Sequence, residues 1–187
     1  MSASWSDPRL GEFSYDGMQW RTIVDAPAFD RFAYQGRRES DAPNGRYEMV
    51  FYVDDMDTTP SQAAADAAAR ALEHQAALPE AVVRALWDDF TGAGPDSGMW
   101  WAGNLEEVAE GFEDLETDPP AGPDDLYASL GLARIAVRSG GEDETPAAEL
   151  MFRARFEEEH GVGVLVDGPA VLGLGYQADV SPFGSDG

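Results

Sequence analysis

The residues best placed to do chemistry in this chain are a histidine and the carboxylates before it. Glu157, Glu158 and Glu159 directly precede His160, one of two histidines. Nearby opposite charge favours the protonated imidazole, which suits a pH-sensitive contact better than a general base working near neutrality. The other histidine, His74, stands apart, and no His-x-x-x-His pair offers a metal site. We therefore expect no metal ion and no cofactor.

Several reactive residue types are missing from the chain. It contains no cysteine, and all 12 of its Lys and Arg residues are arginine. This excludes thiolate zinc sites, cysteine nucleophiles, Schiff-base lysines and the lysine of a phosphate-binding loop. The sequence has neither a complete G-x-G-x-x-G nor a G-x-S-x-G pattern, so a nucleotide loop and a hydrolase elbow are not expected either.

One acidic motif follows a hydrophobic strand. Asp55-x-Asp57-x-Thr59 after Val-Phe-Tyr-Val resembles the nucleophile motif of the haloacid-dehalogenase phosphatases. Those enzymes also use a cation, usually lysine, and a glycine where this chain has Thr58. We therefore interpret the segment as a strand end, a turn and a helix cap. An EF-hand is not expected, because its turn glycine is absent.

The middle of the chain concentrates negative charge. No Lys or Arg lies between Arg84 and Arg134, whereas twelve acidic residues do. Self-repulsion in such a segment favours exposure to solvent or to cations, and tryptophan is a frequent interface anchor. The predicted partner-binding residues are Trp100, Trp101, Glu106, Glu107, Glu110, Glu113 and Asp114. The alternatives are an ordinary solvated face for the acidic residues and, for the tryptophans, one buried and one half-buried core residue.

Overall composition describes a folded, acidic domain. The chain has 187 residues, of which 36 are acidic, giving a net charge of −24, and 43% are hydrophobic. The apolar content is too high for a disordered tail, and direct nucleic-acid binding is disfavoured without clustered cations. A GC-rich genome or a salt-adapted proteome would account for the charge without any function. No signal peptide or membrane span is evident, so a cytoplasmic protein without membrane contacts is expected.

The elements that must position these residues indicate a single α+β domain, with antiparallel strands at both ends of the chain and a helical middle segment. We predict a β-rich part (1–57), a helical, acidic part (58–131), a β-meander (132–180) and a tail (181–187). The expected helices begin near Thr59, as N-cap, and near residues 79, 104 and 124. The expected strands cover 10–15, 18–24, 47–53, 132–138, 150–156, 162–166 and 170–176.

Alternation in two of these strands places arginines together. If 132–138 and 150–156 pair antiparallel, four arginines share one sheet face, and carboxylates must balance their charge. We hypothesise that the acidic middle segment packs across this face and supplies some of them. The four are Arg134, Arg138, Arg153 and Arg155.

The C-terminal hairpin resembles a known pattern. The run Phe156-Glu-Glu-Glu-His160-Gly161-Val162-Gly163-Val164, then an Asp-Gly turn and a Val-Leu-Gly-Leu-Gly-Tyr strand, is similar to a family of uncharacterised bacterial domains. The resemblance covers about residues 122 to 180. It departs at Phe156-Glu157, where the family often has Trp-Asp. The motif residues, structural or ligand-binding, are Glu158, Glu159, His160, Gly161 and Gly163.

This resemblance implies little chemistry. Some small acidic relatives are encoded beside toxins as candidate immunity proteins, and no catalytic activity carries over. Gly161 and Gly163 fit positions of positive φ or a bulge. His160 fits a donor to a nearby carboxylate or carbonyl, and Glu159 an acceptor of backbone N–H groups.

Two functions remain open from sequence. The first is a non-enzymatic acidic binding domain of the immunity type, which neutralises a basic protein partner by occlusion. The second is a small-molecule or divalent-cation binding domain, or a weak hydrolase, centred on Glu159 and His160. Assembly of the chain with itself is a third option, and the oligomeric state stays open.

Overall fold

The computed structural model describes residues 3–36, 44–53, 59–138 and 146–184. Its framework is one eight-stranded sheet in which the strands lie in sequence order. The strands are β1 (Ser4–Asp7), β2 (Gly11–Tyr15), β3 (Gln19–Asp25), β4 (Arg46–Tyr52), β5 (Leu130–Arg138), β6 (Ala148–Ala154), β7 (Val162–Asp167) and β8 (Ala170–Gly175).

The helices lie between the two halves of this sheet in the sequence. They are α1 (Gln62–Glu73), α2 (Leu78–Phe90) and α3 (Leu105–Asp114), with short 3-10 helices η1 (Pro27–Arg31) and η2 (Pro123–Ala128). The α+β class, with strands flanking a helical middle, is therefore confirmed in outline. The two strand-rich ends form one sheet, because β4 and β5 pair in parallel while the other neighbours are antiparallel.

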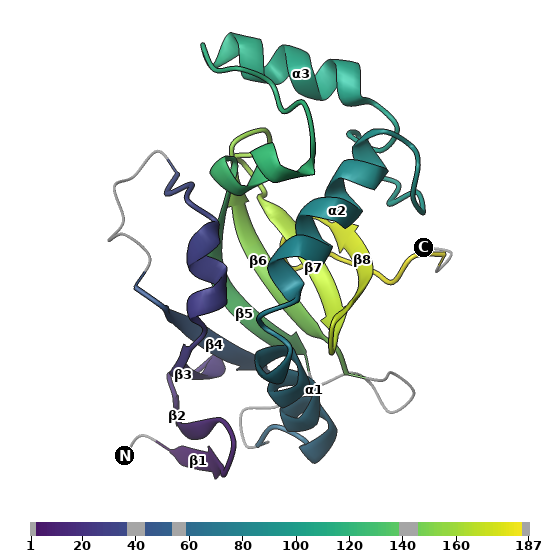
Figure 1. Ribbon diagram of the computed structural model, residues 1–187. Coiled ribbons are helices and arrows are strands. Elements are labelled where there is room, and N and C mark those ends of the chain that lie inside the picture. The colour runs from purple at the N-terminus through teal and green to yellow at the C-terminus, as the bar shows by residue number, and fades with distance from the viewer. Residues whose placement is uncertain (1–2, 37–43, 54–58, 139–145, 185–187) are drawn as a thin grey trace.

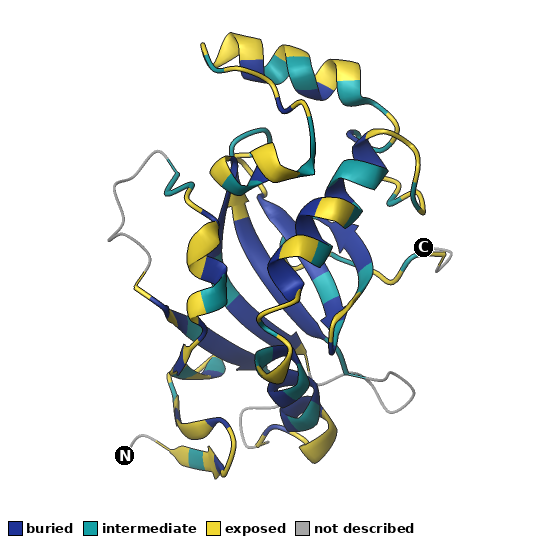
Figure 2. Ribbon diagram, viewed as in Figure 1, coloured by how far each residue is buried: buried dark blue, intermediate teal, exposed yellow. Residues whose placement is uncertain are grey.

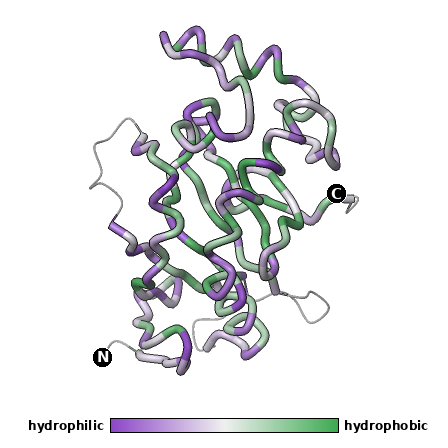
Figure 3. Tube along the Cα trace, in the orientation of Figure 1, coloured by the Kyte–Doolittle hydropathy of each residue, from purple (hydrophilic) through white to green (hydrophobic). Residues whose placement is uncertain are grey.

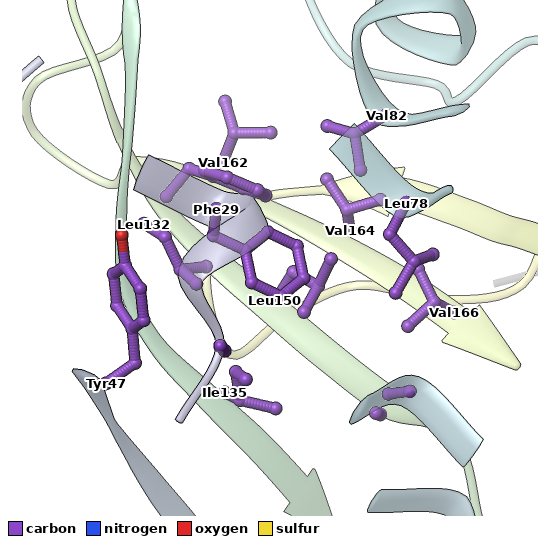
Figure 4. Packing of buried hydrophobic residues seen from close by; sticks show 14 of the residues in the cluster. Phe29, Tyr47, Leu78, Val82, Leu132, Ile135, Leu150, Val162, Val164 and Val166 are labelled. Carbon is purple, nitrogen blue, oxygen red and sulfur yellow. The ribbon is translucent and has the colours of Figure 1, made fainter. Parts of the chain in front are cut away.

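One face of the sheet carries the main core. In Figure 1, α1 and α2 lie across the sheet, whereas α3 lies beyond its end. Figure 2 shows the buried inner sides of both helices and strands, and Figure 3 the apolar strands beneath them. Apolar side chains from η1, α2 and the central strands interlock here (Figure 4), among them Phe29, Val82, Leu150 and Val164.

Local sequence explains how the two main helices form. Ser61, not Thr59, is the N-cap of α1, and its hydroxyl accepts the Ala64 N–H at 3.1 Å. Six buried alanines let α1 approach the sheet closely. The apolar stripe of α2 buries Val82, Leu86 and Phe90 as its periodicity predicts. The Asp55/Asp57 motif lies outside the described residues.

Candidate functional site

The turn between β6 and β7 is built on a glycine. Gly161 has a φ of +66°, and its N–H donates to the Glu157 carbonyl at 2.9 Å. A side chain there would collide with the Gln177 amide and would lie 2.5 Å from the Phe152 carbonyl oxygen. The predicted positive φ is thus confirmed at Gly161. Gly163 has no positive φ and serves close approach, because a Cβ would lie 2.7 Å from Oε1 of Glu149.

His160 is held by Glu157 on this turn. Its Nδ1 lies 3.1 Å from Oε1 of Glu157, which is only 11% exposed, whereas the His160 side chain is 49% exposed. The other carboxylate oxygen of Glu157 accepts the Trp100 indole N–H at 2.8 Å. Because a carboxylate accepts, Nδ1 carries the proton, and Nε2 is the nitrogen left for a ligand or a second proton.

The carboxylate that orients His160 was not singled out from sequence. We expected Glu159 to accept backbone N–H groups, but Glu159 is exposed and makes no hydrogen bond or ion pair within the described ranges. Glu157 does so instead, since it accepts the His160 N–H at 3.3 Å. The Tyr176 ring packs on the imidazole, with 4.6 Å between the centroids.

A cleft of about 560 Å³ opens beside this turn, and we refer to it as the His160 cleft. Glu158, Glu159 and His160 line it together with Arg153 and Gln177. Its opposite wall is the segment 34–36, where the Tyr34 hydroxyl contacts Oε1 of Glu158. The cleft therefore presents groups of both charges and several neutral polar groups to one partly open volume. This arrangement suits the binding of a polar small molecule.

The segment that carries Tyr34 is positioned by a close backbone approach. The Tyr34 N–H donates to the Leu130 carbonyl at 3.0 Å, and a Cβ on Gly131 would overlap the Tyr34 carbonyl. Tyr34 and Gln35 were missed, because no strand or helix predicted from the sequence covers them. The glycine at the start of β5 is the one signal that bears on them, and it does not identify which segment approaches.

Trp101 does not lie on the surface, where its predicted role in partner binding would place it. Its side chain is fully buried, and its indole N–H donates to Oδ2 of Asp89 at 3.0 Å. The Ser97 hydroxyl and N–H also donate to Asp89, at 2.7 and 3.1 Å. Burial raises the pKa of the Asp89 carboxyl, although these hydrogen bonds oppose the shift. Trp101 is therefore a core residue, and its predicted role as a surface anchor is wrong.

The predicted acidic residues of α3 face solvent. Val108 and Phe112 are buried, and Phe112 stacks on Phe156 with 6.4 Å between centroids. The outward residues are Glu106, Glu107, Glu110, Glu113 and Asp114, all exposed. Asn104 donates to Glu107. Among the described residues, no cation forms an ion pair with any of these five carboxylates.

The acidic segment does not balance the sheet arginines. The guanidinium of Arg134 lies 3.6 Å from Glu48 on the neighbouring strand β4. Arg155 instead lies over the Tyr34 ring, 5.2 Å from its centroid. In the parts of the chain that the structure describes, Arg138, Arg153 and Arg155 have no ion pair. The expected packing of acidic residues across this face is therefore wrong.

The described ranges contain neither a metal-binding cluster nor a membrane-spanning helix. No group of three or more His, Asp or Glu side chains there is arranged to hold a metal ion. No helix in those ranges is both long and apolar enough to span a bilayer.

Comparisons with known proteins give no relative. No protein-family model, no curated protein and no solved structure matches this chain. The resemblance of the C-terminal hairpin to a family of bacterial domains stays a prediction, and function must be argued from the geometry alone.

Proposed function

We propose that the protein is a non-enzymatic binding domain that presents α3 to a basic protein partner, as an immunity-type protein does when it occludes its target. The observation that carries this proposal is the state of the α3 carboxylates. Five exposed acidic residues project from one short helix, and no described cation pairs with them. Their mutual repulsion is relieved when a cationic surface docks.

The attachment of α3 supports a docking role. The helix lies beyond the end of the sheet (Figure 1) and is held by Val108 and Phe112. The loop that leads into it is fixed by the Asp89–Trp101 hydrogen bond. An acidic helix on a rigid base keeps its charges in a defined arrangement, which lowers the entropic cost of binding. Trp100 is half-buried beside this base, so it contributes an edge of the contact surface.

The experiment compares two double variants, each of which removes two negative charges. The Glu106→Gln/Glu110→Gln variant is expected to weaken binding to the basic product of a neighbouring gene at least about tenfold at low salt. Glu12→Gln/Glu73→Gln removes equal charge from exposed positions elsewhere and should bind like the parent chain. Calorimetry measures both. Equal binding by all three proteins would refute α3 as the contact surface.

A second candidate function rests on the His160 cleft. This cleft of about 560 Å³ supports small-molecule binding, with Nε2 of His160 and the guanidinium of Arg153 as recognition groups. In this hypothesis a ligand shifts the NMR signals of the His160 ring, and Arg153→Met abolishes the shift. A screen of polar metabolites that leaves those signals unchanged would eliminate it. The divalent-cation form of the hypothesis finds no ligand set in the described residues.

A further inference from the structure

A second hollow, of about 700 Å³, lies where η1 and η2 meet the end of α3. We name it the Arg31–Arg155 groove, after the two guanidinium groups that line it. Tyr127, Asp118, Asp124 and Phe112 also contribute to its walls. It has no wall residue in common with the His160 cleft, and the α3 carboxylates named above do not line it.

The two arginines of this groove differ from most others in the chain. The arginines that pair with carboxylates are Arg9, Arg21, Arg46, Arg70, Arg84 and Arg134. Arg31 and Arg155 have no ion pair with any described carboxylate. Their guanidinium groups lie over the rings of Tyr127 and Tyr34, at 4.1 and 5.2 Å from the centroids. In a protein with a charge of −24, two unpaired cations in one hollow mark a place where an anionic group is accepted.

A tyrosine hydroxyl beneath Arg31 points to the same missing group. The Tyr127 hydroxyl oxygen is buried, and no described group accepts its proton, because the neighbouring Arg31 side chain can only donate. Buried polar groups in folded proteins are nearly always satisfied. An acceptor oxygen that binds beside Arg31 would take the hydroxyl proton as a hydrogen bond. The two observations, unpaired guanidinium groups and an unsatisfied donor, thus call for one carboxylate-like acceptor.

The rim of the groove carries the opposite charge. Asp118 and Asp124 are exposed. Burial raises the pKa of the Tyr127 hydroxyl, the charge of Arg31 lowers it and the charge of Asp124 raises it further, so both charged groups lie near this hydroxyl. Such a rim repels a compact dianion such as phosphate. Between the charges, Phe112, Pro119 and Pro120 supply apolar surface. The groove is therefore complementary to a ligand that combines an anion, a cation and an apolar body.

We propose that the Arg31–Arg155 groove binds a free amino acid with an apolar side chain. Its carboxylate lies between Arg31 and Arg155 and accepts from the Tyr127 hydroxyl. Its ammonium group faces Asp118 and Asp124, and its side chain packs on Phe112. The proposal does not depend on a partner protein at α3, and it assigns no reaction to the ligand.

The first test uses the full chain and three probes of one shape. L-phenylalanine carries both charges, 3-phenylpropionate lacks the ammonium group and 2-phenylethylamine lacks the carboxylate. Calorimetry is expected to show L-phenylalanine binding at least about tenfold more tightly than either analogue, since each loses one pair of charges. Binding of 3-phenylpropionate as tight as that of the amino acid would overturn the proposal. Absence of detectable binding at L-phenylalanine concentrations up to about 10 mM would also overturn the proposal, because a site with a dissociation constant of about 1 mM would be mostly occupied at that concentration.

The second test assigns binding to the groove. Arg31→Met and Arg155→Met should each weaken L-phenylalanine binding about tenfold, and Tyr127→Phe a few-fold, since it removes only one neutral hydrogen bond. Arg84→Met is the matched control, because Arg84 is exposed and pairs with Glu80 on α2. Unchanged affinity in both groove variants would refute the site.

A measurement on the unmodified chain keeps the proposal testable if the methionine variants do not fold. Added L-phenylalanine should shift the NMR amide signals of Ala121 and Ser129, which line the groove. Signals of Gly161 and Gln177 in the His160 cleft should stay in place. Shifts confined to the His160 cleft would place the ligand there and overturn the assignment.

Discussion

The loop between α2 and α3, and α3 itself, are neighbouring stretches of one acidic segment that use carboxylates in opposite ways. In the last turn of α2, just before the loop, Asp89 is buried and accepts three hydrogen bonds from Ser97 and Trp101. Within the loop, Asp96 accepts the Gly98 N–H at 2.8 Å. On α3, by contrast, the acidic side chains face solvent and pair with no described cation.

The difference teaches that negative charge alone does not define a role. A carboxylate becomes structural where indole, hydroxyl or backbone N–H donors surround it, because these donors stabilise its charge inside the protein. The adjacent tryptophans show this twice, since Trp101 donates to Asp89 and Trp100 to Glu157. On α3 such donors are scarce, so the charge remains available to a partner.

Removal of Asp89 should have the largest effect. Asp89→Ala leaves the Trp101 and Ser97 donors unsatisfied, and we expect it to lower the free energy of unfolding by about 2 to 4 kcal/mol. Urea denaturation measures this loss. Asp88→Ala, at the preceding and more exposed position, should cost less than about 0.5 kcal/mol. Similar losses in the two variants would contradict the structural role of Asp89.

Loss of the Trp100–Glu157 hydrogen bond should lower stability less than loss of the Trp101–Asp89 hydrogen bond, because the former lies nearer the surface. Glu157→Ala removes the acceptor of Trp100 and the partner of His160, with an expected cost of about 1 to 2 kcal/mol. Glu159→Ala, two positions along the same turn, should change stability by less than about 0.5 kcal/mol. Thermal unfolding distinguishes them. A larger loss in Glu159→Ala would invert our assignment.

The pH dependence of stability should separate carboxylates whose pKa is raised from those whose pKa is lowered. Burial raises the pKa of Asp89, so the native state binds this proton more tightly than the unfolded chain does. Its contribution to stability is therefore greatest in acid and is lost as pH rises through the raised pKa. The stability difference between the parent chain and Asp89→Ala should widen as pH falls from 7 toward 4.

Asp7 provides the opposite case for the same measurement. A hydrogen bond from the Arg9 side chain lowers the pKa of Asp7, so its contribution is present at neutral pH and lost in acid. The difference between the parent chain and Asp7→Ala should narrow over the same range. Urea denaturation at several pH values measures both, and parallel trends would contradict the assigned shifts.

Neutralising α3 should have the smallest effect on stability. Glu106→Gln/Glu110→Gln should change the free energy of unfolding by less than about 0.5 kcal/mol, toward higher stability, because self-repulsion falls. Added salt screens the same repulsion, so the gain should shrink in 0.5 M NaCl relative to about 0.02 M, as the Debye length shortens. Marked destabilisation would show that these carboxylates are structural.

The sequence predicted what depends on near neighbours. Alternation identified the strands of the meander, and the apolar stripe identified α2. The N-cap of α1 was predicted at Thr59, two residues too early, because Ser61 caps the helix in the structure. Strand β1 was missed, since its four residues alternate too briefly to be recognised.

Long-range contacts were beyond local pattern. The His160 cleft needs Tyr34, which lies far from His160 in the sequence and reaches it through a backbone contact at Gly131. The partner of Trp101 is Asp89, whose burial no periodicity indicates. The parallel β4–β5 pair likewise joins strands separated by the entire helical segment. Each of these features depends on tertiary packing that a sequence window does not contain.

The β4–β5 seam also constrains the order in which the chain can fold. During synthesis, the edge of β4 that pairs with β5 stays unpaired until the chain between Tyr52 and the end of β5 has been synthesised. Closing so long a loop is slow, and an open strand edge invites pairing with other chains in the meantime. Pulse-labelled amides of β4 that bond to β5 should accordingly gain protection together with β5, after the β6–β7 hairpin has formed.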